Sequence, residues 1–295
     1  MAYPKITGLI TALLTAFDEN GNVSEKGVRQ IVRHNIDVNK VDGLYVGGST
    51  GENFLLGTEE KEEIFRIVKD EAKDQVKLIA QVGSLNIKES LHLAKFATDL
   101  GYDSLSAVTP FYYKFSFAEV KDYYNTIINS VDNQMIVYFI PFLTGVNITI
   151  DQFSELFENP KVTGVKFTAG DFYLLERFRK AFPEKMLYAG FDEMMLPATV
   201  LGVDGAIGST FNVNGVRARQ IMDLARAGKI EEALKVQNVT NDFITDVLKN
   251  GLYGTLKICL QEAGVEAGCC RKPMGAYTPE MIEGAKKIYA KYFGK

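Results

Sequence analysis

Met135-Ile136-Val137-Tyr138-Phe139-Ile140 is an unbroken run of apolar and aromatic residues near the middle of the chain. Such runs are typical of parallel strands that are covered on both faces, because neither side of the strand meets water. Similar short runs occur at residues 8–14, 43–46, 77–82, 104–108, 163–166, 186–189 and 205–208. Amphipathic stretches of helical period separate them. Eight strand-then-helix units predict an α/β fold, the (β/α)8 TIM barrel, rather than two domains.

Helix start signals and a late change of pattern complete the predicted architecture. Ser116 and Glu119 form a capping-box pattern ahead of a helical stretch. After about residue 227 the pattern is helical only, and Thr278-Pro279 marks the start of a last helix. We therefore expect a barrel over residues 1–227 and a C-terminal helical extension over residues 228–295.

Composition excludes several classes of protein. The net charge of −4 leaves no basic footprint for nucleic acid. No run approaches the roughly 18 apolar residues that span a bilayer, and the N-terminus lacks the pattern of a secretory signal. The three cysteines are an odd number without metal-ligand spacing. We expect a cytoplasmic protein with no membrane or nucleic-acid partner.

Lys166 stands alone within the strand-like run at residues 162–168. Burial of a lysine favours its neutral amine, which is a nucleophile suited to forming a Schiff base with a carbonyl. A lysine at a strand end can equally reach water or pair with a carboxylate, which is the common arrangement. Lys166 on its own therefore leaves both interpretations open.

The ends of the second and fourth runs carry further candidates. Active sites of such barrels lie at the C-terminal ends of the strands. After the second run, the glycine-rich turn at residues 47–52 holds the hydroxyls of Ser49 and Thr50, which suit a carboxylate or phosphate, or the segment is a plain tight turn. After the fourth run, residues 109–113 form an aromatic cluster that includes Tyr112, a pattern that more often serves packing.

The later strands add a tyrosine, two acids and more hydroxyls. Tyr138 lies inside an apolar run, and its hydroxyl needs a partner that is either a substrate or a structural carbonyl. Asp192 and Glu193 follow the seventh run and could bind a metal, hold sugar hydroxyls or cap a helix. Ser209 follows the eighth run, where barrels frequently bind phosphate, so a phosphate-binding isomerase is a further alternative.

Only two histidines are present, His34 and His92, and both fall in helical stretches away from strand ends. A Ser-His-Asp triad or a histidine-ligated zinc site is therefore not expected. Lys166 remains as the candidate nucleophile and Tyr138 as the candidate proton carrier.

These segments resemble the N-acetylneuraminate lyase and dihydrodipicolinate synthase family of class I aldolases over essentially the whole chain. The matching segments are Gly47-Gly48-Ser49-Thr50-Gly51-Glu52, Thr109-Pro110-Phe111-Tyr112-Tyr113, Tyr138 to Gly145, Gly164-Val165-Lys166 and Gly205-Ala206-Ile207-Gly208-Ser209. The resemblance implies that Lys166 forms a Schiff base with pyruvate, that Tyr138 moves protons and that Ser49 and Thr50 hold the pyruvate carboxylate. It also implies a homotetramer in which Tyr112 is contributed toward a neighbouring subunit's site.

Leu143 and the acidic pair separate the two branches of this family. The synthase branch carries an arginine where this chain has Leu143, and a leucine cannot grip a second carboxylate. The segment Gly190-Phe191-Asp192-Glu193 resembles the lyase branch, whose acids bind the sugar tail. Thr168 and Ser209 also match sugar-contacting positions of that branch.

The expected reaction is therefore reversible cleavage of N-acetylneuraminate to N-acetylmannosamine and pyruvate, with a covalent intermediate and no cofactor or metal. Phe139 and Phe142 are bulkier than this pattern suggests and are expected to alter packing near Tyr138 or substituent preference. Two alternatives stay open. One is a pyruvate-dependent lyase or dehydratase for another 2-keto-3-deoxy sugar acid, and the other is a non-catalytic barrel that binds a sugar acid.

Overall fold

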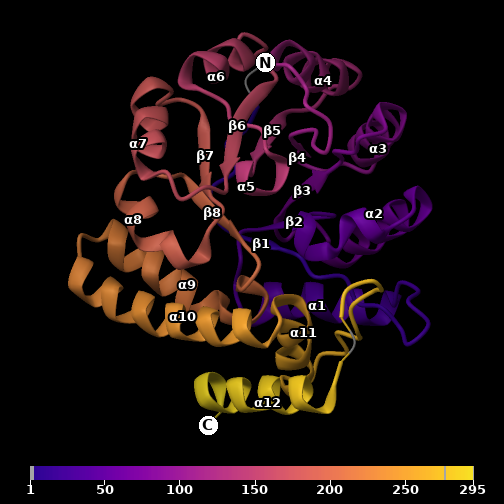
Figure 1. Ribbon diagram of the computed structural model, residues 1–295, viewed down its shortest axis with the longest axis vertical. Coiled ribbons are helices and arrows are strands. Elements are labelled where there is room, and N and C mark those ends of the chain that lie inside the picture. Colours follow the sequence, from indigo (N-terminus) through magenta and orange to yellow (C-terminus); the bar gives the residue numbers. More distant parts are fainter. Residues whose placement is uncertain (1–2, 276, 295) are drawn as a thin grey trace.

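The computed structural model describes residues 3–275 and 277–294 and shows a closed barrel of eight parallel strands in sequential order. Figure 1 shows the barrel with its helices around it. The strands are β1 (Gly8–Ala12), β2 (Gly43–Val46), β3 (Lys77–Gln81), β4 (Ser104–Val108), β5 (Met135–Phe139), β6 (Val162–Phe167), β7 (Met186–Ala189) and β8 (Gly205–Gly208). The predicted (β/α)8 barrel is confirmed.

Each strand is followed by one or two helices, most of which lie on the outside of the barrel. They are α1 (Glu25–Asp37), α2 (Thr58–Ala72), α3 (Ile87–Asp99), α4 (Phe117–Asn129), α5 (Pro141–Thr144), α6 (Ile150–Phe157), α7 (Phe172–Ala181), α8 (Met195–Val200) and α9 (Phe211–Arg226). Short 3-10 turns η1 (Ser49–Gly51), η2 (Asn53–Leu55) and η3 (Asp192–Met194) follow β2 and β7. The predicted capping box is present, because the Ser116 hydroxyl accepts from the Glu119 amide and the Glu119 carboxylate accepts from the Ser116 amide.

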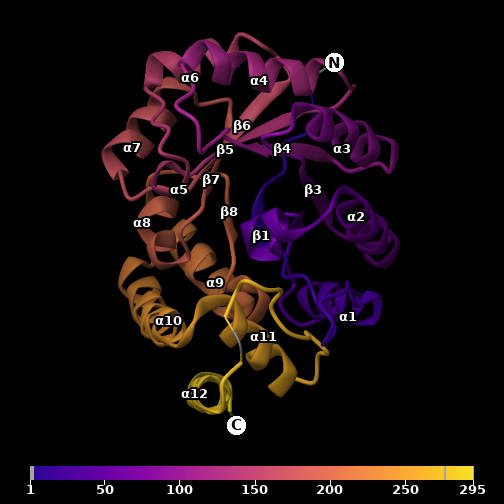
Figure 2. The same ribbon diagram turned by 45° about the vertical axis from the view of Figure 1, so that its right-hand side comes forward.

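Three helices extend the chain beyond the eighth unit: α10 (Ile230–Asn250), α11 (Leu252–Glu262) and α12 (Pro279–Phe293). Thr278 caps α12 as predicted, its hydroxyl accepting from the Met281 amide at 3.2 Å. Figures 1 and 2 show these helices together on one side of the barrel, where α10 packs on α8 and α9 and α11 packs on α9 and α12. Their apolar residues join the main core, so a boundary at residue 227 stays a prediction.

The strands present two apolar faces, as their unbroken hydrophobic character predicted. The outward face joins the helices in one large core, and a smaller core fills the barrel with residues such as Ile10, Ile79 and Ile136. The predicted first strand is too long at its C-terminal end. The strand stops at Ala12, and the Leu14 amide bonds to the Asn212 side chain instead of a neighbouring strand.

Within the described residues, no helix combines the length and apolar character that crossing a bilayer requires.

Candidate functional site

A cavity of about 260 Å³ opens at the C-terminal ends of the barrel strands. It contains nine of the ten residues that the sequence singled out. These are Ser49, Thr50, Tyr138, Lys166, Thr168, Gly190, Asp192, Glu193 and Ser209. Tyr112, the tenth, does not line this cavity, and its side chain is 80% exposed. The structure thus brings together residues that are up to 160 positions apart in the sequence.

Lys166 points into the barrel because side chains alternate along β6. Its neighbours Val165 and Phe167 belong to the outer core, whereas Lys166 pairs in register with Tyr138 of β5 and Tyr188 of β7. Burial lowers the pKa of Lys166 from 10.5 to about 7, although the nearby Asp192 carboxylate acts in the opposite direction. A pKa near 7 leaves about half of the side chain as neutral amine at neutral pH.

Two tyrosine rings surround the amine of Lys166. Its Nζ lies 3.9 Å from the ring centroid of Tyr138 and 4.3 Å from that of Tyr45. The two rings meet edge to face, and the Tyr45 hydroxyl is fixed by a 3.0 Å hydrogen bond to Ser106. Tyr45 therefore limits the room around the amine, a role that the sequence analysis missed because Tyr45 looked like an ordinary strand residue.

Tyr138 presents a protonated phenol to the cavity. Burial raises its pKa from 10.0 to about 12, and the Ser49 hydroxyl partly opposes this shift. At neutral pH the hydroxyl is therefore protonated and can donate this proton. It can also relay a proton, by accepting one from a ligand while it gives its own proton to a nearby basic group.

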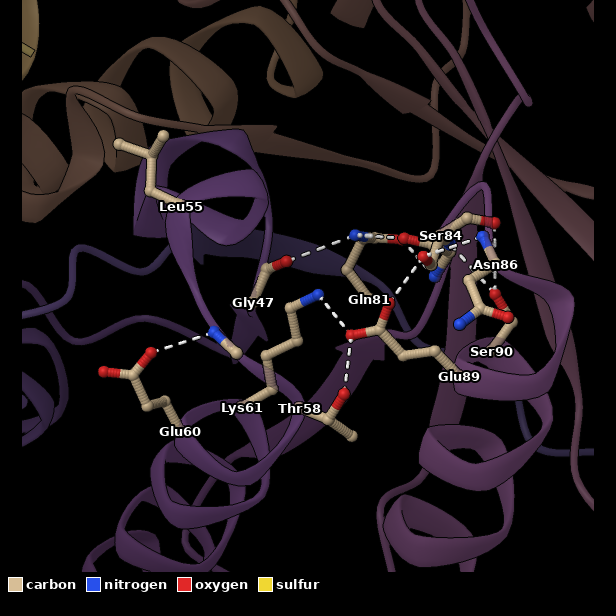
Figure 3. A network of polar contacts seen from close by, with 12 residues as sticks. Gly47, Leu55, Thr58, Glu60, Lys61, Gln81, Ser84, Asn86, Glu89 and Ser90 are labelled. Carbon is tan, nitrogen blue, oxygen red and sulfur yellow. Dashed lines mark hydrogen bonds and ion pairs between the residues drawn. The ribbon is translucent and has the colours of Figure 1, made fainter. Parts of the chain in front are cut away.

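The turn after β2 places two hydroxyls at the cavity wall. Thr50 Oγ1 and Ser209 Oγ are 2.8 Å apart, which joins the ends of β2 and β8. The base of this turn is held by Gln81, whose Nε2 donates to the Gly47 carbonyl at 3.3 Å (Figure 3). The same view shows a second polar cluster, in which Glu89 of α3 accepts from Lys61 of α2 at 2.8 Å.

A polar wall continues along the ends of β6 and β7. The Thr168 hydroxyl oxygen is buried and has no hydrogen-bond partner among the described residues, so a ligand in this cavity can supply one. Gly190 makes this arrangement possible, since a Cβ at that position would lie 1.9 Å from Thr168 Oγ1. The glycine is thus required by its neighbour rather than by turn geometry.

Asp192 is a buried acid with its own supports. Its carboxylate accepts from the Thr210 amide at 2.8 Å and the Thr210 hydroxyl at 2.6 Å. Burial nevertheless raises its pKa from 3.8 to about 6. Gly208 leaves the space for this carboxylate, because a Cβ there would come within 1.9 Å of Oδ1. This acid makes the cavity poorly suited to phosphate, the alternative that Ser209 had raised.

The opposite wall is apolar and comes partly from the C-terminal helices. Ile244 and Leu248 of α10, with Leu252 and Tyr253 of α11, line the cavity. Sequence analysis missed these residues because helical periodicity does not tell which helix reaches the barrel mouth.

Two phenylalanines that the sequence grouped together have different surroundings. Phe142 lines the cavity, and its ring centroid lies 5.9 Å from that of Phe191, which also lines it. Phe139 instead faces the outer core, where its ring packs against Phe153 and Phe167. An effect of Phe139 on the cavity could only be indirect.

The described residues contain no group of three or more His, Cys, Asp or Glu side chains placed to hold a metal ion. The two histidines lie on α1 and α3, and His92 of α3 pairs with Glu62 of α2, away from the cavity lining. The cavity lining instead holds the amine of Lys166, the phenol of Tyr138 and the carboxylates of Asp192 and Glu193.

The model of the Dihydrodipicolinate synthetase family matches residues 5–291. The chain belongs to this family. It is 71% identical to an N-acetylneuraminate lyase of Clostridium perfringens over 97% of this chain and 99% of that protein. The family resemblance expected from the sequence is confirmed.

Solved structures of family members superpose closely. The Clostridium difficile protein CdNal, in complex with mannosamine, has a TM-score of 0.97 at 70% identity, covering 98% of this chain and all of that one. An N-acetylneuraminate lyase from Fusobacterium nucleatum, complexed with pyruvate, has a TM-score of 0.94 at 61% identity, covering 98% and 97%. The solved structures that resemble this chain thus include a protein named N-acetylneuraminate lyase.

Proposed function

We propose that this chain is a class I aldolase that cleaves N-acetylneuraminate reversibly to N-acetylmannosamine and pyruvate. The observation that carries the proposal is the position of Lys166, a buried and half-neutral amine that lines the cavity beside a phenol and a buried acid. The names of the relatives agree with it, since they are N-acetylneuraminate lyases at 71% identity over nearly the full length.

The reaction begins with attack of the Lys166 amine on the ketone carbon of the open-chain sugar acid. The adduct takes up a proton and loses water to give a protonated Schiff base, which withdraws electrons from the adjacent carbon–carbon bond. The bond breaks to leave an enamine and an aldehyde. Protonation of the enamine carbon and hydrolysis of the imine then release pyruvate and restore the Lys166 amine. Ser49 and Thr50 orient the carboxylate of the substrate with hydroxyl and backbone donors, because charge-assisted hydrogen bonds to a carboxylate are strong.

Tyr138 carries the proton that bond cleavage releases. The hydroxyl on the carbon that becomes the aldehyde gives up its proton to Tyr138, whose ring centroid lies 3.9 Å from the amine that holds the substrate. Because the pKa of Tyr138 is about 12, we propose a relay in which the phenol passes its own proton to the substrate carboxylate. A positioned acid or base of this kind typically contributes about 10²–10⁴ in rate.

The polar wall binds the hydroxyl-bearing tail of the sugar. Thr168 offers its unpartnered hydroxyl, Gly190 its backbone, Asp192 and Glu193 their carboxylates, and Ser209 its hydroxyl. Leu143 lines the same cavity and offers no charge to a second carboxylate. The geometry therefore favours a polyhydroxyl substrate over the carboxylate-bearing aldehyde that a synthase takes.

The covalent imine supplies the electron sink, so the proposed mechanism needs neither a cofactor nor a metal. We further propose a cytoplasmic homotetramer, as the family resemblance implies and as the three free cysteines suit. Tyr112, with its exposed ring and left-handed φ of 72°, would then project toward the site of a neighbouring subunit.

The decisive experiment incubates the protein with N-acetylneuraminate and measures pyruvate release. In parallel, pyruvate and sodium borohydride should inactivate the protein and add a pyruvate-derived mass to the peptide that contains Lys166. A Lys166→Arg variant is the matched control, because it keeps a long basic side chain but forms no imine. Pyruvate release at the parent rate by this variant, or an adduct on another lysine, would contradict the proposal.

A further inference from the structure

Glu52 closes the turn that carries Ser49 and Thr50. Its backbone has a φ of 61° and a ψ of 32°, a left-handed conformation that is unfavourable for a side chain with a Cβ. Its amide donates to the Ser49 carbonyl at 3.0 Å and so completes the η1 turn. Something must hold Glu52 in this conformation, since the local backbone does not favour it.

The holding contacts come from the C-terminal extension. Glu52 Oε1 accepts from Lys257 Nζ of α11 at 2.6 Å, and Oε2 accepts from the Arg271 amide at 2.7 Å. Both side chains of the Glu52–Lys257 pair are fully buried. Lys257 Nζ also donates to the Cys269 carbonyl at 2.6 Å and lies 4.7 Å from the ring centroid of Phe17. The pair is thus satisfied on both sides.

Arg271 fastens the same turn at its other end. Its guanidinium donates to the Leu55 carbonyl, at the end of η2, and to the Glu60 carboxylate at the start of α2. The turn after β2 is therefore held by α11 and by the segment that follows it, and no contact of this kind could be foreseen from either segment alone.

Helix α11 also reaches the cavity itself. Tyr253 precedes Lys257 by four residues, so the two side chains lie on the same face of the helix. Tyr253 lines the catalytic cavity while Lys257 holds Glu52. Helix α11 thus connects one wall of the cavity with the turn that forms another wall.

We propose that Glu52 and Lys257 are a positioning pair that fixes Ser49 and Thr50 for the carboxylate of pyruvate. The inference rests on the proposed function, because it assigns to this turn the pyruvate end of the substrate. Neither residue touches the substrate. Their effect is transmitted through the η1 turn, whose residues Ser49 and Thr50 line the cavity.

The test is the double variant Glu52→Gln/Lys257→Met, which removes both charges with little change of shape. Exchange of a whole buried pair is tolerated far better than loss of one partner. The condensation of pyruvate with N-acetylmannosamine is measured at varied concentrations of each substrate. We expect the KM for pyruvate to rise about 10- to 100-fold, which corresponds to the loss of one or two charge-assisted hydrogen bonds to its carboxylate. The KM for N-acetylmannosamine should stay nearly unchanged.

The matched control is Lys61→Met/Glu89→Gln, which removes another largely buried pair, 2.8 Å apart, between α2 and α3 (Figure 3). The control should change thermal stability but leave the KM for pyruvate within about twofold of the parent. If the double variant at Glu52 and Lys257 does not fold, the single variant Glu52→Asp decides in the same assay, because it keeps both charges of the pair and only shortens the side chain that holds the turn.

Equal KM changes for both substrates, an unchanged KM for pyruvate, or the same KM shift in the control would overturn the positioning role. Failure of the proposed function is recognised separately. In that case the parent protein itself would neither condense pyruvate with N-acetylmannosamine nor form a borohydride adduct on Lys166.

Discussion

Replacing Lys166 by methionine should abolish activity and yet make the protein harder to unfold at neutral pH. The folded state holds this lysine with a pKa of about 7, whereas the exposed side chain has a pKa of 10.5. Each pKa unit corresponds to about 1.4 kcal/mol, so the shift costs up to about 5 kcal/mol at pH 7. Methionine has a similar shape and no charge, which removes this cost. We expect the free energy of unfolding to rise by roughly 2–4 kcal/mol. The increase is smaller than the full cost because Asp192 loses a favourable charged neighbour.

The pH dependence isolates the titration of Lys166 from changes in packing. A lysine whose pKa is lowered on folding contributes its full stability above pH 10.5 and loses it progressively as the pH falls to 7. Between pH 7 and pH 9 the free energy of unfolding of the parent should therefore increase by about 2 kcal/mol relative to that of Lys166→Met. The advantage of the variant shrinks accordingly as the pH rises.

Urea unfolding at pH 7 and pH 9 measures both effects, at one protein concentration because association would add to stability. Lys95→Met serves as the control, since the Lys95 side chain is 73% exposed and should change stability by less than about 0.5 kcal/mol at either pH. A Lys166→Met protein that is no more stable than the parent at pH 7, or whose difference is constant across the two pH values, would refute the assignment of a neutral buried amine.

Three further predictions concern catalysis. Tyr138→Phe should lower kcat by about 10²–10⁴ while borohydride still traps pyruvate on Lys166; an unchanged kcat in steady-state assays would remove the proton role. The kcat/KM of the parent should rise as the pH increases through about 6 to 7, because Asp192 ionises and Lys166 loses its proton over this range. A kcat/KM that falls over this range would argue against an ionised Asp192 and a neutral Lys166 as the active forms. Gly190→Ala should displace Thr168, because Thr168 Oγ1 would lie 1.9 Å from the new Cβ. We expect the KM for N-acetylmannosamine to rise about tenfold or more, without a comparable loss of borohydride trapping of pyruvate. Equal losses of N-acetylmannosamine binding and pyruvate trapping would point to general disruption of the site.

Strand-by-strand reasoning predicted the barrel well because each strand is apolar on both faces and each is followed by a helical pattern. It also predicted which end carries the site, since strand ends in such barrels converge. Nine of the ten candidate residues meet in one cavity for this reason. The apolar wall of the cavity could not be predicted from the sequence. Leu248 and Tyr253 come from helices whose hydrophobic periodicity shows that they pack, but not against which element.

Glycines show a similar limit. Neither Gly190 nor Gly208 has a positive φ, and both are required because Thr168 and Asp192 occupy the space of a Cβ. Sequence reasoning attributes a glycine to its own backbone, whereas here the reason lies in a neighbouring side chain. Such steric requirements become visible only once the strands are in register.

Lys257 shows why burial alone does not identify a nucleophile. It lies in the apolar run Leu256-Lys257-Ile258-Cys259 and is more deeply buried than Lys166. The argument first applied to Lys166 would therefore select Lys257 as well. What separates them is their partners, because Lys257 has the Glu52 carboxylate and the Cys269 carbonyl at 2.6 Å. Lys166 faces two aromatic rings and an open cavity, so its amine is left available to a ketone.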